Sequence, residues 1–300
     1  MLDGISSLAL AGLLLMAALF GSIAGPRFLR SWIAQRDAAT VRRVLRQDRL
    51  TIVFQPTVDV RAGRIVSCEA LLRLRDGAGL VSAIGILQAA ENARLGHEIA
   101  CFVLDQVHAA RDVLGGIPVT INTTPADLKS PAVRAAIAAC GATVNVEILE
   151  TAFAGGDPEL AAIVAELRRE GVKIYLDDFG VGYSSLTHFV DLPIDVLKID
   201  RSFVLQLTES EKHRTVCRTI IQMADSCGIE TIAEGVESAD QLAAITDLGC
   251  AKVQGFLFYR PLTADQLAAV LTESPPPAQP LAWPLRVAIL DGSVNRAYGV

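Results

Sequence analysis

The chain has 300 residues, of which 51% are hydrophobic and 20% are charged. This composition is typical of a folded protein with a sizeable core and excludes a disordered polymer. A formal net charge of -6 argues against sequence-blind binding of a nucleic acid polymer, which needs Lys and Arg to neutralise phosphates. A small anionic substrate is still allowed, because a bound metal can supply the positive charge.

The six cysteines form no C-x-x-C pair and no zinc-ligand spacing with a histidine. We interpret them as separate, reduced thiols in a cytosolic domain. No arrangement of Cys with His, and no G-x-S-x-G motif, indicates a covalent nucleophile.

Residues 1–26 contain an uncharged apolar run, 5–24, that is about long enough to cross a bilayer as a helix. Three arginines follow within residues 27–36, so the positive-inside rule places the rest of the chain in the cytoplasm. We expect a single-pass transmembrane helix in the inner (cytoplasmic) membrane. The alternative is a cleaved signal peptide with a cleavage site at residues 22–24, although the basic region that begins such peptides is missing.

Residues 27–50 form a basic linker, in which residues 32–50 are predicted to be an amphipathic helix. One interpretation is a connection that ends where the next domain begins. The other is a helix whose basic face lies on anionic lipid, and the two are compatible.

From Thr51 onward, short apolar runs alternate with longer helical segments. The predicted strands are 51–54, 65–70, 119–121, 144–149, 172–176, 196–199, 231–233 and 252–253. The predicted helices are 83–114, 132–139, 158–170, 212–227 and 239–248. This alternation predicts an α/β fold with a parallel sheet, and its length suits a TIM-type (β/α)8 barrel over residues 51–271. A doubly wound sheet is disfavoured, because no Gly-rich phosphate loop follows an early strand.

The C-terminal residues 272–300 begin with a Pro-rich stretch that cannot continue a helix or a strand. We expect a linker followed by a tail with one short apolar run, 287–290. Whether the tail docks on the domain is left open by the sequence.

Acidic or amide side chains stand at the ends of most predicted strands. They are Glu69, Asn122, Glu147, Asp177 with Asp178, Asp200, Glu234 and Gln254. In a barrel these ends converge on one face, where barrel active sites lie. Carboxylates at this density repel one another without cations, and oxygen ligands favour Mg²⁺ or Mn²⁺ over Zn²⁺. The pattern therefore predicts a site for hard divalent ions.

Lys198 closes the apolar run 193–198 and is expected to project into the same mouth. In one interpretation it only neutralises the carboxylates. In the other it orients or deprotonates an attacking water. Both remain open at the level of the sequence.

Seven segments of the chain occur together in a characteristic order. They are QPTVDVRAGRIVSCEALLR, INTTPADL, EILET, DDFGVGYSSL, LPIDVLKIDRSFV, IAEGVES and QGFLFYRPL. Over residues 43–271 the chain resembles the EAL family of cyclic di-guanylate phosphodiesterases, whose signature triplet is Glu69-Ala70-Leu71. The resemblance implies a modified eight-stranded barrel whose first strand is reversed. It also implies hydrolysis of one phosphodiester bond in cyclic di-guanylate to give linear pGpG.

The resemblance further implies roles for individual residues. A first Mg²⁺ or Mn²⁺ ion would be held by Glu69, Asn122, Glu147 and Asp177, and a second by Asp177, Asp178 and Glu234. A water between the ions would be the nucleophile, with Lys198 and Glu69 as catalytic residues. The substrate would be held by Gln55, Leu71, Arg73 and Gln254. Supporting positions behind the ligands would be Glu150, Asp200 and Glu237, with Glu150 steadying the loop after Asp178. A homodimer through the barrel is also implied.

Two departures from the family pattern lie near the implied metal sites. Leu149 and Val181 stand where the family usually has threonine, so two hydroxyl groups are missing and loop ordering is expected to change. The rim segment 74–96 also lacks the usual Trp and prolines, which bears on substrate affinity.

The leading hypothesis is an active, membrane-tethered phosphodiesterase that lowers the level of the second messenger. A different class is a non-catalytic receptor that binds cyclic di-guanylate and signals through a partner. Loss of a metal ligand or of the lysine would favour that receptor, and neither is lost. A third reading, an unrelated metal-dependent barrel enzyme, fits the carboxylates but not the full motif set.

Overall fold

The computed structural model describes residues 25–77, 79–153, 156–180 and 193–273. The apolar run 5–24, the tail 274–300 and Val181 lie outside these ranges. The chain divides into two compact units. Among the described residues, the helical unit comprises 25–49 and 83–95, and the barrel unit comprises those in 50–82 and from 96 to 273.

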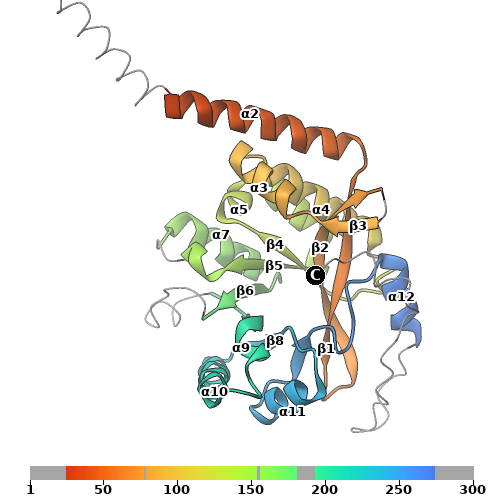
Figure 1. Ribbon diagram of the computed structural model, residues 1–300, viewed down its shortest axis with the longest axis vertical. Coiled ribbons are helices and arrows are strands. Elements are labelled where there is room, and N and C mark those ends of the chain that lie inside the picture. The colour runs from red at the N-terminus through yellow and green to blue at the C-terminus, as the bar shows by residue number, and fades with distance from the viewer. Residues whose placement is uncertain (1–24, 78, 154–155, 181–192, 274–300) are drawn as a thin grey trace, which may run out of the picture. The chain divides into compact units, whose positions relative to one another are not determined.

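The helical unit contains α2 (Gly25–Arg46) and α3 (Ile84–Ala93), which pack along each other (Figure 1). The side-chain amide Nδ2 of Asn92 on α3 donates a hydrogen bond of 2.9 Å to Oδ2 of Asp37 on α2. Among the helices of the described ranges, none combines the length and the apolar character needed to cross a membrane.

Two predicted helix boundaries were wrong for the same physical reason. The helix expected over 32–50 ends at Arg46, and Asp48 then has a left-handed φ of 52°. The helix expected over 83–114 is broken in two at Arg94, where φ is 57°. Residues other than glycine adopt this conformation uncommonly. Hydrophobic periodicity does not reveal it, so the sequence pattern could not predict these helix ends.

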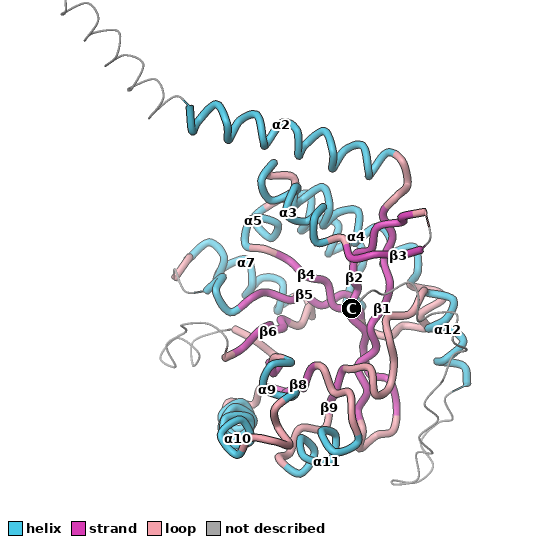
Figure 2. The backbone as a smooth tube through the Cα atoms, in the orientation of Figure 1, coloured by secondary structure: helices cyan, strands magenta, loops and turns pink. Residues whose placement is uncertain are grey.

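The barrel unit is built on nine strands. In chain order they are β1 (Leu50–Asp59), β2 (Arg64–Asp76), β3 (Gly79–Ser82), β4 (Val119–Thr123), β5 (Val144–Leu149), β6 (Ile174–Phe179), β7 (Val196–Ile199), β8 (Glu230–Glu234) and β9 (Lys252–Gln254). The sheet order is β1-β9-β8-β7-β6-β5-β4-β2-β3, and a further pairing of β1 with β2 closes the barrel (Figure 2). β1 is antiparallel to both β2 and β9, whereas β2 and β4 to β9 run parallel. The predicted modified barrel with a reversed first strand is therefore confirmed.

All eight predicted strands are present, with some shifts in their ends. Strands 144–149 and 196–199 have the predicted bounds. The strand predicted over 172–176 instead spans Ile174–Phe179, because the backbone N–H of Val172 still donates to the last turn of the preceding helix. The short strand β3, which pairs with the end of β2, was not predicted.

The remaining described helices belong to the barrel unit. They are α4 (Gly96–Ala110), α5 (Pro125–Lys129), α6 (Pro131–Cys140), α7 (Pro158–Arg169), α9 (Arg201–Leu205), α10 (Glu211–Ser226), α11 (Ala239–Asp247) and α12 (Ala264–Glu273), with the 3₁₀ helices η2 (Gly141–Thr143) and η3 (Glu150–Phe153). In α10, Cys217, Ile220, Ile221 and Ala224 recur at helical spacing and are buried, and this helix packs on β7 and β8. The short α5 and α9, and also α12, were not predicted.

Candidate functional site

Seven polar side chains lie on strands that are consecutive neighbours in the barrel sheet, and all except Glu69 lie at or within two residues of the end of their strand. They are Glu69 on β2, Asn122 on β4, Glu147 on β5, Asp177 on β6, Lys198 on β7, Glu234 on β8 and Gln254 on β9. The strand register holds them level, since Asn122 pairs with Glu147 and Glu234 pairs with Gln254. The structure thus brings the sequence-predicted residues together at the carboxyl ends of the strands.

Lys198 lies at the centre of this group and is only 2% exposed. Its Nζ lies 2.6 Å from Glu147 Oε1 and 2.6 Å from Glu234 Oε1. It also lies 3.3 Å from Glu69 Oε2 and 3.4 Å from Asp177 Oδ1. Burial acts to lower the pKa of Lys198, but the four carboxylates outweigh burial and raise it well above its usual value. The side chain is therefore held as an ammonium ion.

The carboxylates around Lys198 differ in pKa. Burial, followed by repulsion from Glu69, raises the pKa of Glu147 well above its usual value. Burial also raises the pKa of Glu234 to about 7. For Glu69 burial acts in the same direction, but Lys198 and hydrogen bonds from two amides outweigh it and lower the pKa. Glu69 is thus a persistent negative charge, whereas Glu147 and Glu234 accept a proton more readily.

Two amide side chains fix the carboxylate of Glu69. Asn122 Nδ2 donates to Glu69 Oε1 at 2.8 Å, and Gln254 Nε2 donates to Glu69 Oε2 at 2.9 Å. The Thr57 hydroxyl, on β1, donates in turn to Gln254 Oε1 at 3.4 Å. Gln55 Nε2 donates to the carbonyl oxygen of Tyr259 at 2.6 Å, which ties β1 to the segment after β9.

A local break in β6 gives the consecutive residues Asp177 and Asp178 their positions. The pairing register with β7 shifts between Leu176 and Phe179, and Asp178 has a left-handed φ of 54°. Asp177 faces Lys198, whereas Asp178 is exposed and is hydrogen-bonded to Asp200. Partial desolvation of its carboxylate, with repulsion from Asp177, raises the pKa of Asp178.

The predicted supporting residues contact the loops that follow the strands. Glu150 Oε2 accepts a hydrogen bond of 3.1 Å from the backbone N–H of Gly180, next to the β6 carboxylates. Asp200 Oδ1 accepts from the backbone N–H of Ser202 and caps α9. Glu237 forms an ion pair of 2.8 Å with Arg201. These contacts join the loops after β5, β6, β7 and β8.

Leu71 and Arg73, predicted to hold substrate, follow Glu69 at alternate positions of β2 and share its face of the strand. Both are half-buried. The Arg73 guanidinium donates to the carbonyl oxygen of Leu72 at 2.9 Å. Leu149, one of the two departures from the family pattern, is 47% exposed.

Sequence reasoning did not single out Thr57 or Arg201. Thr57 alternates with Gln55 on β1, so strand periodicity could have placed it on the same face as Gln55, whereas its position beside Gln254 depends on the pairing of β1 with β9. No feature of the sequence indicated a role for Arg201, because its position depends on how closely the loops after β7 and β8 pack. A Cβ at Gly235, where φ is 66°, would lie 2.2 Å from Arg201 Cγ.

The donor set fits a hard divalent ion. Within the described ranges, no group of three His, Cys, Asp or Glu side chains is arranged to hold a metal ion. The carboxylates contact the Lys198 ammonium instead. Two buried oxygens, Glu147 Oε2 and Asp177 Oδ1, nevertheless accept no hydrogen bond from a described residue. Four carboxylates face one ammonium, so the site keeps a surplus of negative charge. Oxygen donors with such a surplus are the ligands that Mg²⁺ and Mn²⁺ prefer.

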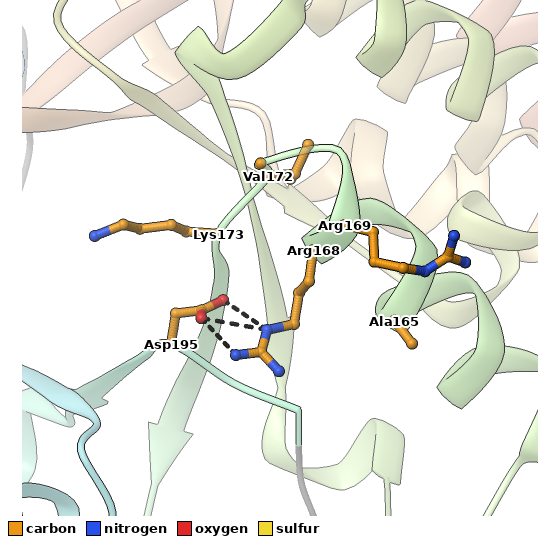
Figure 3. A pocket seen from close by; sticks show the side chains of 7 residues that line it. Ala165, Arg168, Arg169, Val172, Lys173 and Asp195 are labelled. Atoms are coloured by element: carbon orange, nitrogen blue, oxygen red, sulfur yellow. Dashed lines mark hydrogen bonds and ion pairs between the residues drawn. The ribbon is translucent and has the colours of Figure 1, made fainter.

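A separate open cavity of about 380 Å³ lies at the opposite ends of β6 and β7, lined by Ala165, Arg168, Arg169, Gly171, Val172, Lys173 and Asp195. The Arg168 guanidinium forks onto the Asp195 carboxylate, with a closest distance of 2.8 Å (Figure 3). Asp195 Oδ2 also accepts the backbone N–H of Ile174 at 2.9 Å. The Arg168 guanidinium is thus paired with Asp195, and this ion pair ties α7 to the segment before β7.

A comparison with protein-family models matches residues 38–261 to the family described as EAL domain. The chain belongs to the EAL domain family. Its EAL domain is similar to the cyclic di-GMP phosphodiesterase NbdA of Pseudomonas aeruginosa, with 32% identity over 241 residues. That alignment covers 74% of this chain and 30% of NbdA, and the chain spans about a third of the length of the curated relatives it matches.

Solved structures of EAL proteins have the same architecture. The PaMucR phosphodiesterase in complex with c-di-GMP is 31% identical, with a TM-score of 0.70, over 77% of this chain and 99% of that chain. The manganese/cy-diGMP complex of Klebsiella pneumoniae BlrP1 is 26% identical, with a TM-score of 0.63, over 71% of this chain and 56% of that chain. A calcium/cy-diGMP complex of BlrP1 is also similar, at 28% identity.

Proposed function

We propose that this chain hydrolyses one phosphodiester bond of cyclic di-guanylate to give linear pGpG. The observation that carries the proposal is the enclosure of Lys198 by four strand-end carboxylates, two of them 2.6 Å away. The phosphodiesterase NbdA and the c-di-GMP complex of PaMucR support the same substrate. A non-catalytic receptor is less well supported, because each predicted ligand and the lysine are present in this chain.

We propose two Mg²⁺ or Mn²⁺ ions as cofactors, and the manganese complex of BlrP1 supports a divalent metal. The first would be held by Glu69, Asn122, Glu147 and Asp177, and the second by Asp177, Asp178 and Glu234. When bound, such ions polarise a phosphoryl oxygen and make water a better nucleophile at neutral pH. Since Lys198 now occupies the centre of the ring, binding requires the carboxylates to exchange contacts with it.

The state of Lys198 bears on its chemical role. In the metal-free arrangement the surrounding carboxylates raise the pKa of Lys198 well above its usual value, so the side chain is an ammonium there. We propose that Lys198 orients the attacking water and stabilises the negative charge that develops on the phosphoryl oxygens. Glu69, with its lowered pKa, keeps a permanent carboxylate beside it.

The substrate is proposed to lie over Gln55, Leu71, Arg73 and Gln254. The planar guanidinium of Arg73 suits a phosphate group, because two parallel N–H donors match two of its oxygens. Leu71 contributes an apolar, half-buried surface between Glu69 and Arg73. Gln55 and Gln254, from neighbouring strands, are both buried and hydrogen-bonded, which fixes their orientation.

The cellular arrangement is also a proposal. Residues 1–26 would form a single transmembrane helix in the inner membrane, and residues 27–50 a basic linker, so that the barrel of residues 51–271 works in the cytoplasm. Arginines that follow the apolar run support this orientation. A homodimer through the barrel is proposed from the family resemblance, and residues 272–300 would form a Pro-rich linker and tail.

The proposal is tested with the full chain purified in detergent. Incubation with cyclic di-guanylate and Mg²⁺ or Mn²⁺, followed by chromatography, should yield pGpG. The Arg168→Met variant is a matched control, because Arg168 lies at the opposite end of the barrel and its loss should leave turnover unchanged. Binding of cyclic di-guanylate without any product would instead identify a receptor. Absence of both binding and product would contradict the proposed substrate.

A further inference from the structure

A second layer of inward-facing side chains lies one step below the predicted ligands of the first metal. Side chains of a strand alternate between its two faces, so residues two apart share a face. Two positions before Glu69, Asn122, Glu147 and Asp177 stand, respectively, Ser67, Thr120, Asn145 and Tyr175. All four residues of this second layer are at least nine-tenths buried. We call them the barrel floor.

The Tyr175 hydroxyl joins the barrel floor together. It accepts a long hydrogen bond of 3.5 Å from Asn145 Nδ2, and the hydroxyls of Thr120 and Ser67 lie close enough that hydrogen bonding to them acts to lower the pKa of the phenol, against the larger effect of burial. Asn145 Oδ1 accepts the backbone N–H of Lys173 at 3.2 Å, at the entrance to β6. One phenol group therefore links β6 to β2, β4 and β5.

The ring of Tyr175 completes the layer on the other side. It clusters with Val196 and Ile232, which precede Lys198 and Glu234 by two residues on β7 and β8. The same side chain thus supports the lysine strand and the β8 carboxylate strand by packing. An apolar side chain of similar size would fill this space equally well, so packing does not account for the hydroxyl.

A buried hydroxyl is costly unless it is hydrogen-bonded, and a satisfied buried network fixes the relative positions of its members. The four strands joined by this network are the four that carry Glu69, Asn122, Glu147 and Asp177. We propose that Tyr175 is a positioning residue that sets the spacing of these four ligands through the barrel floor. This inference rests on the proposed metal-dependent function. Tyr175 acts through the strands, because it lies two residues below Asp177 and is 6% exposed.

The test compares Tyr175→Phe with the wild type, as full chains in detergent. Manganese binding is measured by titration calorimetry in the absence of substrate, and kcat and KM are measured separately. Tyr175→Phe keeps the ring and removes the hydroxyl, so the fold should be retained. We expect Mn²⁺ affinity and kcat each to fall about 10-fold, as for other groups that orient metal ligands, with KM unchanged.

Substitutions of Thr120, a partner of the Tyr175 hydroxyl, distinguish a positioning role of Tyr175 from a packing role. Thr120→Val removes the partner hydroxyl without changing shape and should reproduce the Tyr175→Phe loss, whereas Thr120→Ser should restore affinity. The double variant should be no weaker than either single variant, because both break one network. Thr143→Val is the matched control, since its hydroxyl donates to the Cys140 carbonyl outside the barrel interior. It should leave Mn²⁺ affinity unchanged.

Several results would overturn the inference. One is a Tyr175→Phe variant with a lowered melting temperature but with Mn²⁺ affinity and kcat within twofold of the wild type. Another is strict additivity of the Tyr175 and Thr120 effects. If Tyr175→Phe fails to fold, the Thr120→Val and Thr120→Ser pair decides. Absence of Mn²⁺ binding by the wild type would also overturn it, whereas wild-type binding without pGpG would overturn only the proposed function.

Discussion

Lys198 Nζ lies 2.6 Å from Glu147 Oε1, and both side chains are almost completely buried. An ion pair without water is sensitive to the loss of either partner, because the remaining charge is left uncompensated. The second oxygen of Glu147 has no hydrogen-bond donor among the described residues. The ion pair therefore stabilises the interior of the barrel. A further positive charge next to this second oxygen of Glu147 would also be stabilising.

Replacement of Lys198 by methionine should destabilise the metal-free protein by about 3 kcal/mol at pH 8, because the buried carboxylates lose their cation. Without the ammonium the folded-state pKa values of Glu147 and Glu234 rise further above the unfolded values, and Glu69 loses the partner that lowers its pKa. The folded variant therefore binds more protons than the wild type, and the deficit shrinks as pH falls. Urea unfolding at pH 8 and pH 6 measures this difference. The variant should also lose about 100-fold or more in kcat while retaining substrate binding. A rise in KM with kcat unchanged would make Lys198 a binding residue.

Glu69→Ala should abolish hydrolysis while the barrel remains folded. Lys198 keeps its contacts with Glu147 and Glu234, so the fold does not depend on Glu69 for charge compensation. Mn²⁺ affinity should fall about 10- to 100-fold. Product chromatography and circular dichroism check the two parts, with the exposed Glu166→Ala on α7 as the matched control. Turnover within a few-fold of the wild type would contradict the assignment of Glu69 as a ligand.

Mg²⁺ or Mn²⁺ should restore hydrolysis after chelation, and Ca²⁺ should not. Calcium takes longer bonds and more ligands, so it holds the attacking water and the phosphate at the wrong spacing. Mn²⁺ should also raise the melting temperature, since an ion at 100 times its Kd adds about 2.7 kcal/mol to folding. Differential scanning fluorimetry of the wild type and Glu69→Ala measures this, with a smaller shift expected in the variant. Equal rates with calcium would remove the two-metal argument.

Glu230 gives a pH-dependent contribution at the other end of the barrel. Its Oε2 lies 2.8 Å from Lys252 Nζ and 3.6 Å from Lys173 Nζ. Burial acts to raise the pKa of Glu230, but the lysines outweigh it, so the folded-state pKa lies below the unfolded value of about 4.3. The stabilisation is present above about pH 4.3 and is lost as pH falls through the folded-state pKa.

Glu230→Gln should therefore lower the melting temperature at pH 7, and the difference from the wild type should shrink below about pH 4.3 and vanish once the pH is below the folded-state pKa of Glu230. Thermal unfolding across this range measures it, with exposed Glu209→Gln as the control. A difference that grows on acidification would mean that the lysines do not stabilise the Glu230 carboxylate.

The candidate site was largely predictable because strand alternation and strand ends are local features of a sequence. Glu147, for example, lies in the second half of a strand, Val144–Leu149, whose bounds were predicted without error. The sequence placed Asp177 and Asp178 together at the metal site, but it did not predict how their side chains diverge, because this depends on a left-handed φ at Asp178. Tyr175 was not singled out, because nothing in the run around it distinguishes a floor residue from an ordinary core tyrosine.

The sequence by itself determined the order of strands and helices, the polar residues at the strand ends and the surplus of acidic charge there. These features follow from periodicity and residue type, which act over a few neighbouring positions. Only the tertiary structure decided that Lys198 meets Glu69, 129 positions away, and that one phenol hydroxyl links β2, β4, β5 and β6. Such contacts depend on the register and closure of the whole barrel, and the break at Arg94 depends on a backbone conformation that side-chain patterns do not record.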